Sequence, residues 1–302
     1  MSGKTLQIDA RPAFLLGVSL FDALGPTPPR DQDLDALRNW GVNTVRVWAH
    51  WHQPIYQADG ALTAQGRARL LALVGRLQAR GLVLELVLLR PGQLPGQPFA
   101  VFASEAARVH AAGEIASALR ESGNVIFDLY NEHDHPDGPI SHAAARMLRD
   151  AVKAADPARI VTISSTESHL MTADGRVGDA EARNLREEAG QEAGSVGVDV
   201  VAAHFPRTAD WAAATSGRLG ALRAALDRIG RGVPIYLNEE RRANPPAVIA
   251  ADVYQRACAA AQEAGAAGWV FHTAAGFELH KRPFLDALMK EEREGIARIK
   301  KR

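Results

Sequence analysis

The chain has 302 residues, 47 % of them hydrophobic, which suits one large α/β domain or two ordinary ones. Lysine plus arginine and aspartate plus glutamate balance at 35 each, so the formal net charge of +0 excludes a global electrostatic attraction to nucleic acid or an anionic membrane. The N-terminus lacks the apolar region of a signal peptide, and no apolar run approaches the about 20 residues of a membrane span. Unless a leader has been removed, we therefore expect a cytoplasmic protein with neither nucleic-acid nor membrane partners; an oligomeric state is not predicted.

Apolar, β-rich segments alternate with helical patterns along the whole chain. The expected strands are residues 14–21, 44–49, 82–89, 125–130, 160–164, 198–203, 234–238 and 268–272. Eight such alternations predict a protein of the α/β class, a single (β/α)8 barrel spanning residues 1–302. An open doubly wound sheet is the alternative, but the segment from Gly17 after the first strand lacks the usual glycine-rich phosphate loop.

Helical segments between these strands show apolar stripes at positions i, i+3, i+4 and i+7. One stripe consists of Leu70, Leu73, Val74 and Leu77, a second of Leu219, Leu222, Leu226 and Ile229, and a third, within residues 143–155, of Met147, Leu148 and Val152. Glycines at 41, 81, 123 and 232 follow helical stretches and precede strands, where a helix C-cap belongs.

Polar and aromatic residues gather at the predicted carboxyl ends of the strands, the end of a barrel that carries the chemistry. They include Arg46, Trp48, His50, Trp51, His52, Asn131, Glu132, His133, His135, His204, Glu239, Glu240 and His272. Glu132 and Glu239 each close a buried-looking strand, the fourth and the seventh. Two such carboxylates could act together on one bond, as retaining glycosidases require.

Several motifs along the chain resemble clan A glycoside hydrolases, nearest to family five and the related cellulase-like proteins. Residues 41–48, Gly-Val-Asn-Thr-Val-Arg-Val-Trp, are similar to the second strand of that clan, and Asp59-Gly-Ala-Leu62 is similar to its approach to the third. Tyr130-Asn-Glu132 matches the Asn-Glu pair that closes the fourth strand, and residues 234–239, Pro-Ile-Tyr-Leu-Asn-Glu, match the nucleophile motif of the seventh. The resemblance covers most of the chain and implies a carbohydrate substrate and no cofactor or metal.

By this resemblance the protein hydrolyses a β-glycosidic O-linkage by double displacement, with Glu132 as general acid/base and Glu239 as nucleophile. Glu132 must then start protonated, while Arg46 holds Glu239 charged and oriented. Asn131 is expected to bond the sugar hydroxyl beside the reacting carbon, and His204 to lie near the nucleophile or the sugar. The remaining expected supporting or substrate-binding residues are Trp48, Trp51 or Phe277 as an apolar face for a pyranose ring, and His50, His133, Glu240 and His272.

Three positions depart from the pattern of that clan and leave the substrate class open. Pro206 stands where many members carry a tyrosine after the sixth strand, and His272 stands where a tryptophan usually closes the eighth. Glu240-Arg241-Arg242 replaces an aromatic residue and a glycine after the seventh strand. Glu240 is also the fallback nucleophile if the strand register differs by one residue.

Two other functions remain as alternatives. His50 with His52, and His133 with His135, form H-x-H pairs that could bind zinc in a metal-dependent barrel hydrolase, whose activity would respond to a chelator. A catalytically silent barrel would instead hold a glycan without turnover.

Overall fold

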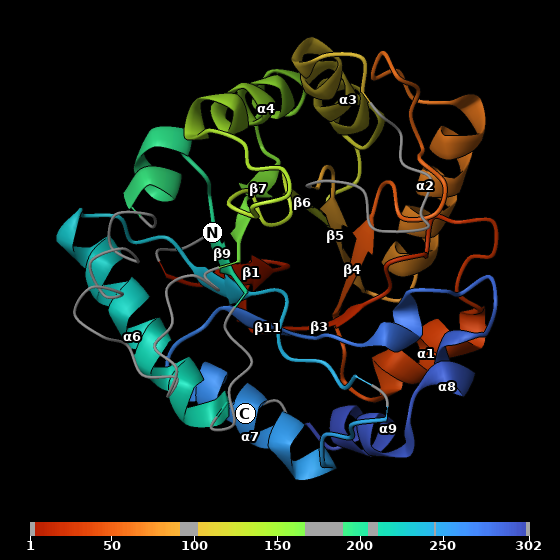
Figure 1. Cartoon of the computed structure of the whole chain (residues 1–302), viewed down its shortest axis with the longest axis vertical. Helices are drawn as coiled ribbons and strands as arrows, with labels where there is room; N and C mark the ends of the chain where they lie inside the picture. Colours follow the sequence, from red (N-terminus) through yellow and green to blue (C-terminus); the bar gives the residue numbers. More distant parts are fainter. Residues whose placement is uncertain (1–3, 91–101, 167–189, 205–210, 245, 300–302) are drawn as a thin grey trace.

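Parallel strands occupy the centre of the molecule and helices surround them (Figure 1). The computed structural model describes residues 4–90, 102–166, 190–204, 211–244 and 246–299. The nine-stranded sheet consists of β3 (Leu15–Ser19), β4 (Thr44–Trp48), β5 (Val83–Val87), β6 (Val125–Asp128), β7 (Ile160–Thr162), β8 (Ser164–Ser165), β9 (Val201–Ala203), β10 (Ile235–Leu237) and β11 (Gly268–Phe271). Its order is β7-β6-β5-β4-β3-β11-β10-β9-β8, and β7 and β8 are separated in sequence by Ile163 alone. The two ends of the sheet therefore meet within the expected fifth strand, and the predicted (β/α)8 barrel is confirmed.

The outer layer is helical. It contains α1 (Asp31–Asn39), α2 (Ala64–Gln78), α3 (Glu105–Ala118), α4 (His142–Ala155), a π-helical turn at Gln191–Val196, α6 (Trp211–Arg228), α7 (Ala251–Glu263), a 3₁₀ turn at Ala274–Gly276, α8 (Phe284–Ala287) and α9 (Lys290–Ala297). The hydroxyls of Thr63, Ser104 and Ser141 accept hydrogen bonds from the first turns of α2, α3 and α4, and so satisfy amide groups that lack a partner inside the helix. Within the described residues, no helix is both long and apolar enough to cross a membrane.

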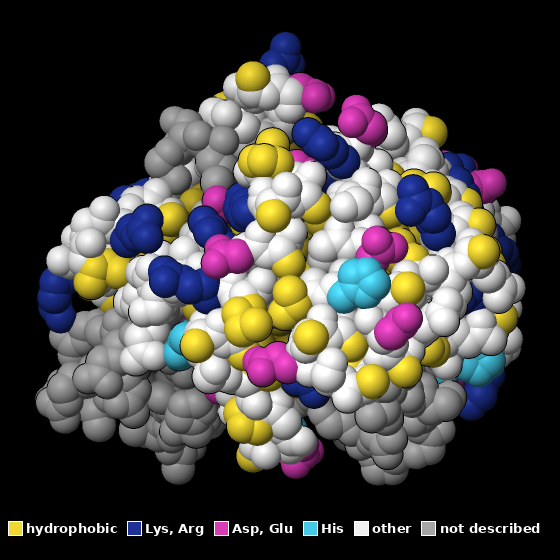
Figure 2. All heavy atoms as spheres, turned by 90° about the horizontal axis from the view of Figure 1, so that it is seen from above, with side chains coloured by type: hydrophobic (Ala, Val, Ile, Leu, Met, Phe, Trp, Pro, Cys, Tyr) yellow, Lys and Arg dark blue, Asp and Glu magenta, His cyan; other side chains and the backbone are white. Residues whose placement is uncertain are grey.

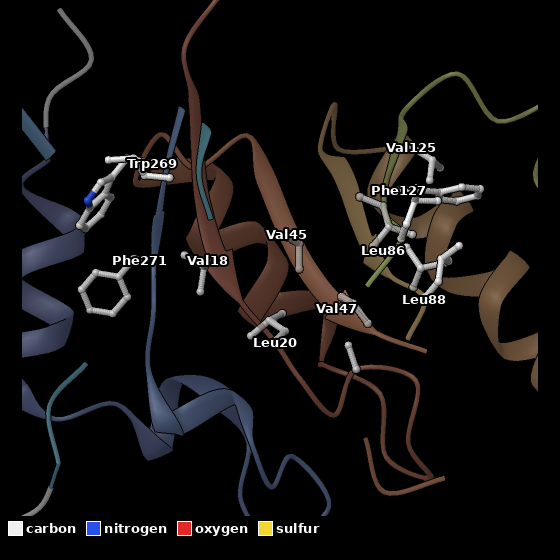
Figure 3. Packing of buried hydrophobic residues seen from close by; sticks show 14 of the residues in the cluster. Val18, Leu20, Val45, Val47, Leu86, Leu88, Val125, Phe127, Trp269 and Phe271 are labelled. Carbon is white, nitrogen blue, oxygen red and sulfur yellow. The ribbon is translucent and has the colours of Figure 1, made fainter. Parts of the chain in front are cut away.

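Alternate side chains of each strand face outward and form the core between sheet and helices. Figure 3 shows Trp269 and Phe271 extending from the same side of β11, and these residues share one buried cluster with Val45, Leu86 and Phe127. Complete burial of such a side chain contributes about 1.5–3 kcal/mol each. On the surface seen in Figure 2, acidic and basic side chains are interspersed, in keeping with the balanced composition.

The interior of the barrel is apolar near the amino ends of the strands. Leu6, Leu15, Ile126, Val200 and Tyr236 are among the members of this inner cluster. The ring of Tyr236 fits because β11 begins with glycine: a Cβ at Gly268 would lie 2.6 Å from that ring. Polar interior residues follow nearer the carboxyl ends of the strands. The inner apolar cluster thus forms a plug at the amino ends, and the candidate site lies on its carboxyl side.

A short N-terminal hairpin, which we did not predict, supplies Leu6 to this plug. Strand β1 (Leu6–Ile8) pairs antiparallel with β2 (Arg11–Ala13) through a two-residue turn. The turn residues Asp9 and Ala10 both have positive φ angles, 50° and 61°. This matches a type I′ hairpin turn, although its sequence lacks the asparagine and glycine that usually mark one.

Candidate active site

Arg46 lies at the centre of a buried polar cluster inside the barrel. Its Nη1 donates to Glu239 Oε2 at 2.8 Å, its Nε to Glu85 Oε1 at 2.9 Å, and its Nη2 to Asp128 Oδ2 at 2.8 Å and Asn131 Oδ1 at 2.7 Å. Arg46, Glu85 and Asp128 are fully buried. One guanidinium thus fixes Glu85 on β5 and Asp128 on β6. It also fixes Asn131 and Glu239, which follow the ends of β6 and β10.

The cluster holds one cation and three carboxyl groups, and burial shapes its protonation. Burial alone would lower the pKa of Arg46, but the charges of Glu85, Asp128 and Glu239 outweigh it and raise that pKa above its usual value. Burial raises the pKa of Glu85 to about 7, against the opposing effect of Arg46. A proton held by Glu85 lowers the negative charge around the guanidinium.

Glu132 and Glu239 approach each other across the carboxyl end of the barrel, as predicted. One oxygen of each, together with one nitrogen of His204, lie within 4.8 Å of one another. The Glu239 side chain is 8 % exposed and that of Glu132 is 21 % exposed. His204 Nδ1 lies 3.1 Å from Glu132 Oε1, so the histidine contacts Glu132 directly.

The backbone holds Glu132 in an unusual conformation. Its φ angle is 52°, in the left-handed region that a residue with a Cβ seldom adopts. The Glu132 amide donates to Ser164 Oγ at 3.3 Å, and the next amide, of His133, donates to the Ser164 carbonyl at 3.0 Å. Ser164 Oγ also donates to Asp128 at 2.8 Å, so the same serine links this turn to the Arg46 cluster. Strain of this kind persists where the surroundings fix the chain, and it occurs often at functional sites.

His272 lies near the carboxylate oxygen of Glu239 that Arg46 does not bind. Its Nδ1 is 3.8 Å from Glu239 Oε1, whereas Arg46 binds Oε2. Arg242 Nη1 lies 2.9 Å from His272 Nε2. Because a guanidinium can only donate, Nε2 must accept, and the ring proton resides on Nδ1, facing Glu239. The chain therefore replaces the expected tryptophan and glycine by a paired histidine and arginine.

The aromatic residues near the site pack mainly against one another. Phe21 stacks on Trp48 with ring centroids 3.5 Å apart, and the Arg46 guanidinium carbon lies 4.3 Å from the Trp48 ring centre. Trp48 and Trp51 are 1 % and 5 % exposed, so neither presents an open face to a sugar. Phe277, partly buried against Phe21 and Trp51, is the one of the three expected candidates that keeps accessible surface.

Three residues predicted to support the site lie elsewhere. His50 is buried with its ring 5.9 Å from Tyr56, and burial lowers its pKa to about 3, with a further contribution from Arg90. His133 is buried against Glu192 of the π-helical turn, at 3.1 Å. Glu240 is fully buried and accepts a hydrogen bond from the indole of Trp211 on α6, so it faces the helical layer and the fallback assignment as nucleophile is wrong.

Within the part of the chain that the structure describes, neither H-x-H pair brings its two histidines together as ligands of one ion. Alternate residues of an extended segment would share a face, but here the chain has left the strand and turns. His50 is buried, while His52 Nε2 contacts the Phe277 carbonyl at 2.9 Å. His133 is buried, and His135 is 33 % exposed beside Asp137.

Sequence inspection missed three members of the buried cluster, Glu85, Asp128 and Asn238. Asn238 Nδ2 donates to Glu85 Oε1 at 2.7 Å and lies 3.3 Å from Asp128 Oδ2. A signal was present: Glu85 interrupts an apolar strand, and a charge buried there requires a partner. Glu85 is also the register partner of Arg46 across β4 and β5. Pro206, one of the departures noted above, lies outside the described residues.

The sequence of this barrel was compared with models of known protein families. The sequence model of the cellulase family (glycosyl hydrolase family 5) matches residues 6–218. The barrel and the family match place the chain among the glycoside hydrolases. The chain belongs to glycosyl hydrolase family 5, and the predicted family resemblance is confirmed. No curated protein matches the chain.

Solved structures show the same fold at low sequence identity. An exo-β-1,4-mannosidase from Opitutaceae bacterium strain TAV5 superposes with a TM-score of 0.67 at 16 % identity, over 98 % of this chain and 61 % of that one. This chain thus spans less than two thirds of the mannosidase. A broad-specificity endoglucanase from an uncultured bacterium gives 0.65 at 15 % identity, covering 95 % and 94 %. An endo-1,4-β-mannanase from Rhizomucor miehei gives 0.65 at 13 %, covering 98 % and 96 %.

Proposed function

We propose that the protein is a retaining β-glycosidase with Glu239 as nucleophile and Glu132 as general acid/base. The observation that carries this proposal is the approach of Glu132 and Glu239 oxygens to within 4.8 Å at the carboxyl end of a family 5 barrel. Retaining enzymes hold their carboxyl groups about 5–5.5 Å apart, whereas inverting enzymes need about 6.5–9.5 Å to admit a water molecule.

In the first step, Glu239 attacks the anomeric carbon while Glu132 transfers its proton to the leaving oxygen. The bond from sugar to leaving group breaks as the bond from sugar to Glu239 forms. Arg46 donates to Glu239 Oε2, and His272 Nδ1 lies 3.8 Å from Oε1, so these two groups orient the carboxylate for attack. Asn131 contacts the neighbouring sugar hydroxyl in this mechanism, and its hydrogen bond to Arg46 supports that role.

In the second step, water hydrolyses the glycosyl–Glu239 ester. Glu132, now deprotonated, removes a proton from that water, and the released sugar keeps its original anomeric configuration. His204, 3.1 Å from Glu132 Oε1, orients this carboxyl group in both steps. Phe277 supplies the apolar surface for a sugar ring.

For the substrate we propose a β-linked hexose oligosaccharide of the glucan or mannan type. The endoglucanase and mannanases that share the fold support this choice, as does a related enzyme whose structure was solved with cellopentaose. The changes at positions 242 and 272 alter the surroundings of the nucleophile, so a survey of sugars is needed rather than one substrate.

The test is hydrolysis of aryl β-glycosides and β-1,4-linked oligosaccharides by wild type, Glu239→Gln and Glu132→Gln. Glu239→Gln should abolish turnover of every substrate. Glu132→Gln should lower turnover of oligosaccharides by about 10²–10⁴-fold, yet still release dinitrophenol in a burst, because that leaving group needs no proton. Glu121→Gln, an exposed glutamate on the surface, serves as the matched control and should keep wild-type activity.

Proton NMR of the first product formed gives the stereochemistry. A β-anomer that appears before mutarotation supports double displacement. An α-anomer, or undiminished activity in Glu239→Gln, would refute the proposed mechanism. Binding of these glycans by folded wild type without turnover would favour the silent barrel.

A further inference from the structure

Asp22, His52 and His280 form a second cluster at the carboxyl end of the barrel. Each residue offers one ligand atom, and the three atoms lie within 4.8 Å of one another. They come from three separate segments: Asp22 follows β3, His52 follows β4, and His280 follows the 3₁₀ turn after β11. The fold thus brings together two imidazoles and a carboxylate that are far apart in sequence.

The carboxylate is buried and its hydrogen-bond capacity is only half used. Asp22 is fully buried, and its Oδ2 accepts from His280 Nδ1 at 2.8 Å and from the His280 amide at 3.3 Å. Among the described residues, Asp22 Oδ1 has no hydrogen-bond partner, and no lysine or arginine forms an ion pair with Asp22. A buried carboxylate oxygen without a donor is costly, and a cation would offset that cost.

Each histidine can present one ring nitrogen to an ion bound at Asp22. His52 Nε2 lies 2.9 Å from the Phe277 carbonyl and must donate to it, which leaves the lone pair on Nδ1. His280 Nδ1 lies 2.8 Å from Asp22 Oδ2, so an ion that displaces the proton of this hydrogen bond can bind that nitrogen and that oxygen together, with the ring proton on Nε2. The His280 side chain is 29 % exposed, so an ion can reach the cluster from solvent. For His52, the bond from its second nitrogen to a carbonyl is the usual arrangement of a metal-ligating histidine.

We propose that Asp22, His52 and His280 form a binding site for a divalent transition-metal ion such as Zn²⁺. Two imidazole nitrogens and one carboxylate oxygen suit a borderline ion of this kind, and water completes a tetrahedral shell. The site is separate from the Glu132–Glu239 pair and does not depend on the proposed glycosidase mechanism.

Metal binding here would tie together three loops that carry an aromatic cluster. Phe21 directly precedes Asp22, Trp51 directly precedes His52, and the Phe277 carbonyl contacts His52. The centroids of these three aromatic rings lie 4.4–5.2 Å apart. Trp51 Nε1 donates to the same Phe277 carbonyl that contacts His52. The ion would therefore fix the edge of the sugar site on which Phe277 lies.

Isothermal titration calorimetry of the full chain with Zn²⁺, after removal of metal by chelator, tests the site. We expect one ion per chain with a Kd of about 10 μM or tighter. His280→Ala and His52→Gln should each raise Kd at least about tenfold, whereas His110→Gln, at an exposed histidine, and His135→Gln, at a partly exposed one, should leave it unchanged.

Co²⁺ absorption gives a second readout that does not depend on any variant. Strong visible bands on addition of Co²⁺ to wild type, displaced by Zn²⁺, would support a tetrahedral site. Wild type that binds neither ion, or His280→Ala that binds Zn²⁺ as wild type does, would overturn the proposal. Both measurements are independent of turnover, so they stand apart from the test of the glycosidase.

Discussion

Arg46 connects most of the groups that define the site, and its position carries an energetic cost. A buried ion network seldom stabilises a fold more than apolar packing would, because each charge loses its hydration. Its value here is orientation: one rigid guanidinium fixes Glu239, Asn131 and Asp128 at once.

Replacement of Arg46 by methionine should destabilise the protein strongly. The change leaves Glu85, Asp128 and Glu239 without their shared cation, so we expect a loss of about 3–5 kcal/mol in the free energy of unfolding at pH 8. At pH 5 the loss should be smaller, since protons can neutralise the carboxylates. Urea unfolding measures both, with Arg67→Met on the exposed face of α2 as control. Equal effects of the two substitutions would contradict this account.

The pair formed by His272 and Arg242 makes a separate prediction about rate. Arg242→Met removes the donor that places the ring proton of His272 opposite Glu239. We expect kcat to fall about tenfold, equivalent to about 1.4 kcal/mol in the barrier, with little change in KM. Steady-state kinetics of Arg242→Met beside Arg241→Met checks this. A change confined to KM would show that Arg242 binds substrate instead.

At the scale of elements, strands were easier to locate than their ends and turns. All eight predicted strand segments contain barrel strands, but the expected 198–203 begins only at Val201 and the expected 160–164 is interrupted at Ile163.

Among the helices, the stripe on α2 is buried as predicted, whereas Met147 and Ile229 are 48 % and 45 % exposed. Gly41 and Gly81 adopt the positive φ of a C-cap, but Gly230 takes that role in place of Gly232. Apolar character identifies the element, and packing decides which members of a stripe are covered.

The N-terminal hairpin offers a stabilising substitution. Ala10 has a φ angle of 61°, a conformation that costs an L-residue about 1–2 kcal/mol and glycine very little. Ala10→Gly should therefore raise the free energy of unfolding by about 1 kcal/mol. The control Ala68→Gly, at an exposed position within α2, should lower it by about 1 kcal/mol. Thermal and urea unfolding of both variants test the turn, and destabilisation by Ala10→Gly would show that the hairpin is not formed.

At the scale of the whole molecule, two buried groups give stability opposite dependences on pH. Burial lowers the pKa of His50 to about 3, so between about pH 3 and 6.5 the unfolded chain binds a proton that the folded chain does not. This contribution lowers stability as pH falls. Burial raises the pKa of Glu85 to about 7, so between about pH 4.5 and 7 the folded chain holds the extra proton, and this contribution lowers stability as pH rises.

His50→Gln separates the two contributions. On going from pH 7.5 to 5.0, wild type loses the His50 contribution at about 1.4 kcal/mol per pH unit below pH 6.5, about 2 kcal/mol in all. The variant should lack this part of the loss, while His110→Gln, at an exposed histidine, should behave as wild type. Urea unfolding at the two pH values gives the comparison. Identical pH profiles for His50→Gln and wild type would mean that His50 is not buried as a neutral ring.

The sequence alone determined the barrel and the pair Glu132 and Glu239, because both are written in local patterns. Apolar strands alternate with amphipathic helices, and the Asn-Glu motifs fall where two strands end. The resemblance to the clan also predicted Arg46 as the partner of Glu239.

Only the tertiary structure decided which side chains meet across strands. It brought Glu85, Asp128 and Asn238 to Arg46, set Arg242 and His272 beside Glu239, and turned Glu240 towards α6. It also separated His52 from His50 and placed it near Asp22 and His280. Such contacts join residues up to 258 positions apart, and they depend on register and on turn geometry that no local pattern specifies.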